Sequence, residues 1–176
     1  RCAGAWGTLG CFSFYPSKNL GAVGDGGCIT TDDSEIAERL RLLRTHGSAC
    51  GERYTLVGTN SRLDSIQAAA LRAKLPLLKE WTEGRVRNAA LYAEELSACP
   101  DLVLPILDPG QNPVWSHYTL RCREAGLLRA ALEGQGIESR HYYATPVYRQ
   151  PAPGESSLPV GRRPEAERAC AAALPV

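Results

Sequence analysis

The chain has 176 residues, a formal net charge of +1 and an isoelectric point near 7.7. So small a charge provides no basic surface for nucleic acid or an anionic membrane, and no apolar stretch reaches the ~18 residues of a membrane span. We therefore expect no nucleic-acid partner and no membrane segment. The sequence begins with Arg1 and contains no methionine, so we expect a fragment of a longer protein.

The seven cysteines are widely scattered, and none belongs to a Cys-x-x-Cys pair. An odd number of cysteines without metal-ligand spacing favours neither a disulfide framework nor a metal site. We expect reduced, mostly buried cysteines in a cytoplasmic protein, because thiols stay reduced in that compartment.

The first elements of the chain are predicted from side-chain shape and capping signals. Residues 10–15 and 27–31 are rich in aromatic or β-branched side chains, which predicts two strands joined by a glycine-rich loop. Asp33 and its acidic neighbours predict the start of a helix, because carboxylates accept hydrogen bonds from the first turn. Gly47 predicts the end of that helix.

Helices are also predicted in the middle of the chain. Residues 48–61 are polar, and we expect irregular structure there. A helix follows from Leu63, Pro76 kinks or splits it, and a second helix covers residues 83–96. Apolar residues spaced by three or four positions predict a buried stripe on the first of these helices. The stripe consists of Ile66, Ala69, Ala70, Ala73 and Leu77.

The remaining part of the chain predicts a small two-layer α/β unit with the order β-β-α-β, and the domain boundary is expected near residue 83. Trp115, Leu120, Leu128, Leu132 and Ile137 are its candidate core. The predicted elements are strands at 102–106, 115–121 and 137–143, a helix at 124–132, a loop at 151–157 and a last helix at 163–173.

Lys18 is the most informative single residue. Only three of the 20 basic residues are lysines, and this one directly follows a short aromatic strand and precedes a glycine loop. An amine can lose its proton and form a Schiff base, whereas a guanidinium cannot. The loop has neither the spacing of a P-loop nor that of a dinucleotide-binding motif, so a nucleotide fold is not indicated.

Two motifs together resemble the DegT/DnrJ/EryC1/StrS family of pyridoxal phosphate (PLP) sugar aminotransferases. The first is Phe-Ser-Phe-Tyr-Pro-Ser-Lys-Asn-Leu at residues 12–20, followed by Gly-Asp-Gly-Gly at 24–27. The second is Gly-x-Asn-x-Arg-x-x-x-x-Gln-Ala-Ala at residues 58–69, in which Asn60 lies 42 residues after Lys18. Residues 115–121 and 141–146 match the family more loosely.

The resemblance implies roles for four residues near the cofactor. Lys18 would form the Schiff base with PLP, and an apolar pocket would ease its deprotonation. Ser13 would bind the PLP phosphate, and Tyr15 would lie on the substrate side. Asn60 would reach the PLP phosphate of a neighbouring subunit. The alternatives are an inward-facing strand serine for Ser13, a core aromatic for Tyr15 and a helix N-cap for Asn60.

The resemblance also places candidate substrate contacts on both sides of the chain. Arg53 and Tyr54 precede the second motif, where family members contact the nucleotide diphosphate, although plain surface positions are an equal alternative. His141 and Tyr142 are candidates for a substrate pocket, with a structural role as the alternative. The acid that pairs with the pyridine nitrogen of PLP, and the ring that stacks on it, would precede this chain.

The implied fold is α/β. Residues 1–82 form the later part of the PLP-binding large domain of a fold-type I aminotransferase, and residues 83–176 form most of its small C-terminal α/β domain. The implied protein is a homodimer that transfers an amino group from glutamate or glutamine to a keto-sugar, and the expected substrate is a nucleotide-linked keto-deoxyhexose. The alternatives are a cyclitol (keto-inositol) aminotransferase, a non-catalytic PLP-fold regulatory protein and a remnant that cannot fold alone.

Overall fold

The computed structural model describes residues 1–150 and 163–176, so the loop expected at 151–157 lies outside the described residues. The chain forms two compact units, Arg1–Trp81 and Thr82–Val176. Their boundary lies one residue from the predicted one, while their assignment to a large and a small domain stays a prediction. Among the described residues, no helix is long and apolar enough to cross a membrane.

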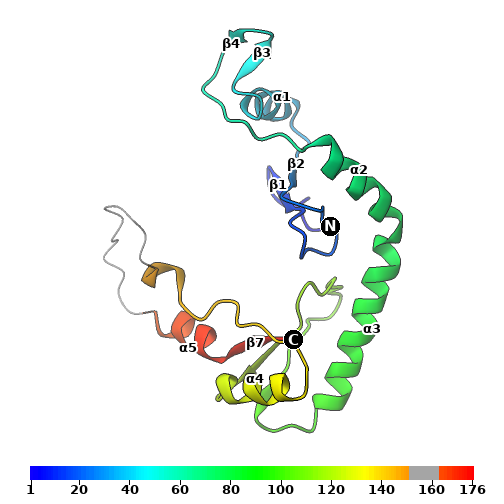
Figure 1. The fold of residues 1–176 in the computed structure, drawn as a ribbon, viewed down its shortest axis with the longest axis vertical. Helices are drawn as coiled ribbons and strands as arrows, with labels where there is room; N and C mark the ends of the chain where they lie inside the picture. Colours follow the sequence, from blue (N-terminus) through cyan, green and yellow to red (C-terminus); the bar gives the residue numbers. More distant parts are fainter. Residues whose placement is uncertain (151–162) are drawn as a thin grey trace. The chain divides into compact units, whose positions relative to one another are not determined.

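The first unit begins with a hairpin that confirms both predicted strands. β1 (Gly10–Ser13) pairs antiparallel with β2 (Gly27–Thr30), and Ser13 lies opposite Gly27 (Figure 1). Beyond the ladder, the Phe14 N–H donates to the Gly26 carbonyl at 2.7 Å, and the Ala22 N–H donates to the Phe14 carbonyl at 2.7 Å. Phe14 therefore ties both ends of the glycine loop to the strand that precedes Lys18.

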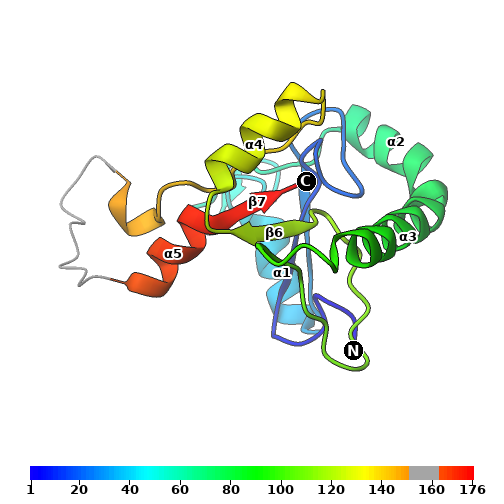
Figure 2. The ribbon, with the colours of Figure 1, turned by 90° about the horizontal axis from the view of Figure 1, so that it is seen from below.

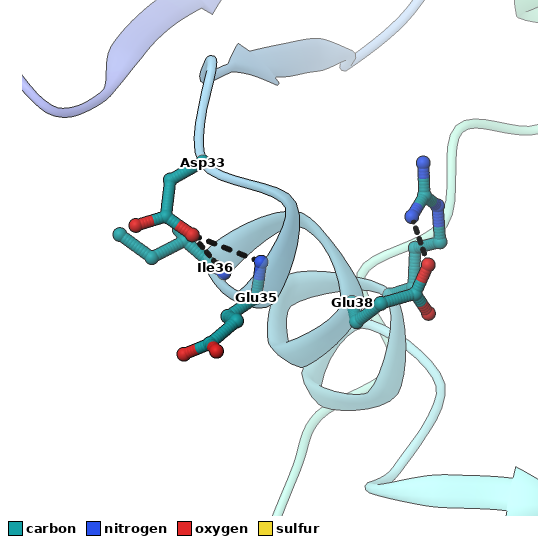
Figure 3. A network of polar contacts seen from close by, with 5 residues as sticks. Asp33, Glu35, Ile36 and Glu38 are labelled. Carbon is teal, nitrogen blue, oxygen red and sulfur yellow. Dashed lines mark hydrogen bonds and ion pairs between the residues drawn. The ribbon is translucent and has the colours of Figure 1, made fainter.

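Helix α1 (Ser34–Leu43) begins where the capping signal predicts. The Asp33 carboxylate accepts from the N–H groups of Glu35 at 2.9 Å and Ile36 at 3.1 Å (Figure 3), which satisfies two donors of the first turn. The helix ends before Gly47, whose φ of +79° is the left-handed conformation that glycine adopts most easily.

The expectation of irregular structure over residues 48–61 is wrong for part of that segment. β3 (Ser48–Cys50) and β4 (Arg53–Tyr54) form a short antiparallel hairpin with a shifted register. Gly51, with φ of +54°, lies at its turn. The polar composition of this segment gave no sign of strands, because a two-stranded ribbon open to solvent does not need alternating apolar and polar residues.

Pro76 splits the next helical region as predicted. α2 (Ser65–Lys74) passes through a 3₁₀ turn, η1 (Leu75–Leu77), into α3 (Leu78–Leu96). α3 therefore starts five residues before the predicted position. Asp64, which accepts from the Ile66 N–H at 2.9 Å, is the N-cap of α2, so the alternative that Asn60 caps this helix is wrong.

The predicted buried stripe on α2 is also wrong. Ile66 is 71% exposed, whereas Leu71, outside the stripe, is 7% exposed and is the buried residue of this helix. Periodicity identifies an apolar face, but burial requires a second element over that face. The remaining stripe residues are exposed or half-buried: Ala69, Ala70, Ala73 and Leu77.

The second unit contains a three-stranded antiparallel sheet in the order β5-β6-β7, packed with helices α4 (Ala125–Gly134) and α5 (Pro164–Ala172). Figure 2 shows β6 beside β7, with α5 leading directly into β7. Both helices match predicted ones within a few residues. The strands are β5 (Leu102–Val103), β6 (Thr119–Cys122) and β7 (Ala173–Pro175), and a further 3₁₀ turn is η2 (Val147–Arg149).

The strand predicted at residues 137–143 is wrong, because β7 takes the place beside β6. Leu174 lies opposite Leu120 and is only 1% exposed, so pairing β7 with β6 buries an apolar side chain. Residues 137–143 reach this edge through one backbone bond, from the Arg140 N–H to the Pro175 carbonyl at 3.2 Å. Strand propensity alone cannot choose between two candidate partners for the same edge.

The core of the second unit centres on Ala89, Tyr118 and Leu120. Of the five predicted core residues, Leu120 is buried and Ile137 is 48% exposed, because the latter precedes the segment that fails to join the sheet. All seven cysteines are free, as expected, but the prediction that most are buried is wrong. Only Cys122 is buried, since several others lie on hairpins or turns that no second layer covers.

Candidate active site

Lys18 lies in the turn directly after β1, and its backbone N–H donates to the Tyr15 carbonyl at 2.9 Å. Its side chain is exposed, so no apolar pocket surrounds it within the described residues. The amine has no hydrogen bond or ion pair with any described residue. The amine is therefore accessible to an incoming carbonyl group.

Ser13 and Tyr15 lie in the same stretch as Lys18. The Ser13 Oγ accepts from the Tyr15 N–H at 3.2 Å, which leaves the hydroxyl proton available to donate elsewhere. Ser13 is exposed and Tyr15 is 53% exposed, so neither is buried in this unit as the alternatives required. A hydroxyl, a phenol and an amine are thus presented together on the turn that ends β1.

Asn60 is held against the end of α1 by the backbone. It forms an isolated antiparallel bridge with Thr45, and the following N–H, of Ser61, donates to the Arg44 carbonyl at 2.9 Å. The Asn60 Oδ1 accepts from the Arg62 Nε at 3.0 Å, so its amide N–H groups remain available as donors. No described contact joins Asn60 to Lys18 within one chain.

The glycine loop after Lys18 is attached to α2 by two side chains whose roles sequence analysis missed. The Gln67 Oε1 accepts from the N–H groups of Val23 and Gly24, each at 2.9 Å. The Lys74 Nζ donates to the Gly21 carbonyl at 2.8 Å. Gln67 belongs to the second motif, and this membership marks it in the sequence as a candidate functional residue. The spacing of the motif does not show which backbone groups its side chain binds.

Arg53 and Tyr54 form β4 of the second hairpin, and both are exposed, Tyr54 by 63%. They lie in the first unit, like Lys18, Ser13 and Asn60. Their exposure agrees both with a contact to an anionic substrate and with a plain surface position. A substrate-binding role for these two residues stays a prediction.

His141 and Tyr142 lie in the second unit. The His141 Nε2 contacts the Cys170 carbonyl, and the Tyr142 ring meets the His117 ring edge-on with centroids 5.4 Å apart. Nearby, hydrogen bonds to Glu138 and the charge of that residue raise the pKa of Arg140. The structural alternative therefore accounts for the His141 contact, while a substrate contact by either residue stays a prediction.

Metal ligands are not gathered anywhere in residues 1–150 and 163–176: no group of three His, Cys, Asp or Glu side chains is close enough to hold an ion.

The length of the sequence match to a known protein family shows where this chain belongs. A sequence profile of the DegT/DnrJ/EryC1/StrS aminotransferase family matches residues 1–176, the whole chain. The chain belongs to this family. It is 43% identical over 167 residues to a dTDP-3-amino-3,4,6-trideoxy-alpha-D-glucose transaminase of Streptomyces venezuelae, covering 95% of this chain and 44% of that protein. It is 44% identical to a pleiotropic regulatory protein of Geobacillus stearothermophilus, covering 99% and 47%.

Solved structures of the family share this fold. S. venezuelae DesV in complex with a ketimine intermediate matches with a TM-score of 0.89 and 42% identity, over 100% of this chain and 47% of that chain. Bacillus subtilis NtdA with bound cofactor PMP matches with a TM-score of 0.86 and 25% identity, over 98% and 42%. The predicted α/β aminotransferase fold is confirmed. The chain spans about half the length of these relatives.

Proposed function

We propose that the protein containing this chain is a PLP-dependent aminotransferase that transfers an amino group to a keto-sugar. The observation that carries the proposal is the exposed, unpaired amine of Lys18, on a turn between β1 and the glycine loop, in a chain matched by the family over its whole length. The substrate we propose is nucleotide-linked, which the dTDP-sugar transaminase of S. venezuelae supports.

The residues present fit the cofactor by the chemistry of their free groups. The Lys18 amine suits an aldehyde. The Ser13 hydroxyl and the Asn60 amide each have their oxygen already bonded as an acceptor, which directs their N–H or O–H donors outward. Hydrogen bonds from such donors to an ionised phosphate are charge-assisted and therefore strong. The bound PMP of the NtdA structure supports the same cofactor class here.

Lys18 performs the chemistry that belongs to this chain. When bound, PLP supplies an electron sink for the carbanion at the substrate carbon. The Lys18 amine would hold the cofactor by its aldehyde and, once displaced there by the donor amine, would act as the base that takes the proton from the donor Cα. With the keto-sugar it moves a proton in the opposite direction. Ser13 and Asn60 hold the phosphate, so the reacting atoms stay aligned.

The assembly we propose is a homodimer with shared sites. Asn60 of one subunit serves the PLP phosphate of the other, which agrees with the absence of any described contact between Asn60 and Lys18. The donor we propose is glutamate or glutamine. The proposed compartment is the cytoplasm, which the seven free cysteines support.

A non-catalytic regulatory protein is the second candidate, because one relative is named a pleiotropic regulatory protein. Lys18 opposes it, since a protein that only binds does not need an amine able to form and break a covalent bond. A cyclitol aminotransferase would share Lys18 but would not need Arg53 for a diphosphate. Arg53→Ala in the whole protein would raise KM for a nucleotide-linked sugar and leave KM for a free keto-inositol unchanged.

The central test replaces Lys18 in the whole protein. PLP is expected to give the wild type a visible absorbance band, which borohydride fixes covalently to Lys18, as located by peptide mass analysis. Lys18→Ala is expected to lose the adduct and at least ~10³-fold in kcat, and Lys18→Arg to lose as much because it keeps only the charge. Lys79→Arg is the control. Turnover retained by Lys18→Ala would refute the aminotransferase proposal.

A further inference from the structure

The loop that follows Lys18 is held by one side-chain oxygen from a helix more than 40 residues away. The Gln67 Oε1 accepts from two consecutive backbone N–H groups, those of Val23 and Gly24, at 2.9 Å each. A single acceptor that receives two consecutive amides fixes the orientation of both peptide planes as well as their position. α2 thereby controls the conformation of a segment five residues beyond Lys18.

The loop approaches the Gln67 amide closely at Gly24. A Cβ added at Gly24 would lie 2.8 Å from the Gln67 Nε2, so glycine at this position lets the loop approach the side chain without displacing its amide. Ala22 and Leu71, exposed by 2% and 7%, are the buried hydrophobic residues of this unit. The Lys74 Nζ adds a second attachment at the Gly21 carbonyl, 2.8 Å away.

The backbone on both sides of Lys18 is held by hydrogen bonds. On one side is β1, where the Phe14 carbonyl accepts from the Ala22 N–H at 2.7 Å. On the other side is the loop held by Gln67. The Lys18 side chain itself has no described partner, so the conformation of the backbone on its two sides determines which positions its amine can reach.

We propose that Gln67 is a positioning residue for Lys18: by accepting from the Val23 and Gly24 amides, it holds the glycine loop in the conformation that places the Lys18 amine for reaction. The expected effect on the reaction rate rests on the proposed function, whereas the attachment of the loop can be measured without catalytic turnover. A displacement of about 1 Å at a reacting group can reduce a rate by up to ~10²-fold, so even a small shift of the loop would have a measurable kinetic effect.

The test compares Gln67→Met with Gln67→Glu in the whole protein. Methionine keeps the length and apolar volume but removes the acceptor, whereas glutamate keeps an oxygen that accepts both amides. If Gln67 only filled space, both variants would be tolerated, whereas an acceptor role predicts that only glutamate is. Gln135→Met is the matched control, because Gln135 is exposed and its side chain makes no described hydrogen bond.

The first readout is amide hydrogen exchange of the cofactor-free protein. Gln67→Met is expected to speed exchange at Val23 and Gly24 by roughly tenfold, since each lost bond is worth a few-fold, while the β1 amides stay unchanged. Gln67→Glu and Gln135→Met are expected to match the wild type. Unchanged exchange at Val23 and Gly24 in Gln67→Met, or faster exchange throughout the first unit, would overturn the proposal.

The second readout is the rate at which PLP and borohydride modify Lys18, together with kcat. Both are expected to fall about tenfold in Gln67→Met, with KM for the keto-sugar unchanged, and to stay within about twofold of wild type in Gln67→Glu. Equal rates in Gln67→Met and wild type would overturn the positioning role. Absence of any Lys18 adduct in the wild type would instead refute the proposed function, and the exchange experiment would still decide the loop attachment.

Discussion

The two units of this chain bury very different amounts of apolar structure. The first contains two two-stranded sheets and buries only Ala22 and Leu71 among its hydrophobic side chains, whereas the second contains a three-stranded sheet. Two-stranded hairpins are marginal by themselves, so the first unit depends on side-chain attachments such as that of Gln67. The buried hydrophobic residues of the second unit are Ala89, Tyr118, Leu120, Cys122, Ala125 and Leu174.

The comparison shows that the candidate chemistry lies on the less buried unit. Lys18, Ser13 and Asn60 all lie there, and all are exposed. Reactive side chains must reach a cofactor, so exposure at these positions follows from their proposed role. The apolar residues of the second unit have no such role and can be buried to stabilise the fold.

The largest expected effect concerns sharing of the site between two copies of the first unit. Lys18→Ala and Asn60→Ala whole proteins, each inactive alone, are mixed, unfolded and refolded together. Random pairing makes half of the dimers mixed, each with one intact site, so about a quarter of wild-type activity is expected. Mixed dimers that form but stay inactive would contradict a shared site.

The next largest effect tests the core of the second unit. Leu174→Ala truncates a leucine that is only 1% exposed and is expected to lower the free energy of unfolding by about 2–4 kcal/mol. Urea unfolding followed by Trp115 fluorescence measures it. Leu127→Ala, at a leucine 69% exposed, is the control and should change stability by less than ~0.5 kcal/mol. Equal effects of the two variants would show that β7 does not complete this sheet.

A smaller effect is expected at the helix cap of the first unit. Asp33→Ala removes the acceptor of two hydrogen bonds (Figure 3) and should destabilise α1 by about 1 kcal/mol. Asp32→Ala, at an exposed neighbour that makes no described hydrogen bond, controls for the loss of charge. Exchange rates of the α1 amides measure the difference in helix stability between the two variants. Identical rates in both would show that Asp33 does not cap the helix.

The smallest effect is a pH dependence in the second unit. Burial raises the pKa of the Tyr118 phenol above its ordinary value of 10, because desolvation disfavours the phenolate. The folded state therefore holds this proton more tightly than the unfolded state. The stabilisation is complete below pH 10 and is lost as the pH rises through the folded pKa.

Tyr118→Phe removes this titration and keeps the ring. Above pH 10 the free energy of unfolding of the wild type is expected to fall more steeply than that of the variant, as measured by urea unfolding at successive pH values. Tyr143→Phe, at a tyrosine 73% exposed, should follow the wild type. Parallel pH profiles of wild type and Tyr118→Phe would contradict the effect of burial.

Local signals were enough for several elements of this chain. Asp33 identified the start of α1, Pro76 identified the break between α2 and α3, and the strands flanking the glycine loop were predicted to within two residues at each end. Each depends on residues within one or two turns or on the backbone limits of a single residue type.

Non-local partners caused the errors. Residues 137–143 have strand propensity, yet β7 pairs with β6 because the pairing buries Leu174. Ile66 has helical spacing, yet among the described residues it stays 71% exposed. Both outcomes depend on which distant segment arrives at a given edge or face, and a local pattern carries no information about that.

The sequence by itself determined the family, the lysine with its glycine loop and the second motif at a fixed separation, because these are covalent features read in order along the chain. Only the tertiary structure decided that Gln67 and Lys74 of α2 hold that loop, that β7 completes the second sheet, and which apolar faces are buried. The physical reason is that hydrogen bonds and burial between distant segments form only once the backbone has brought those segments together.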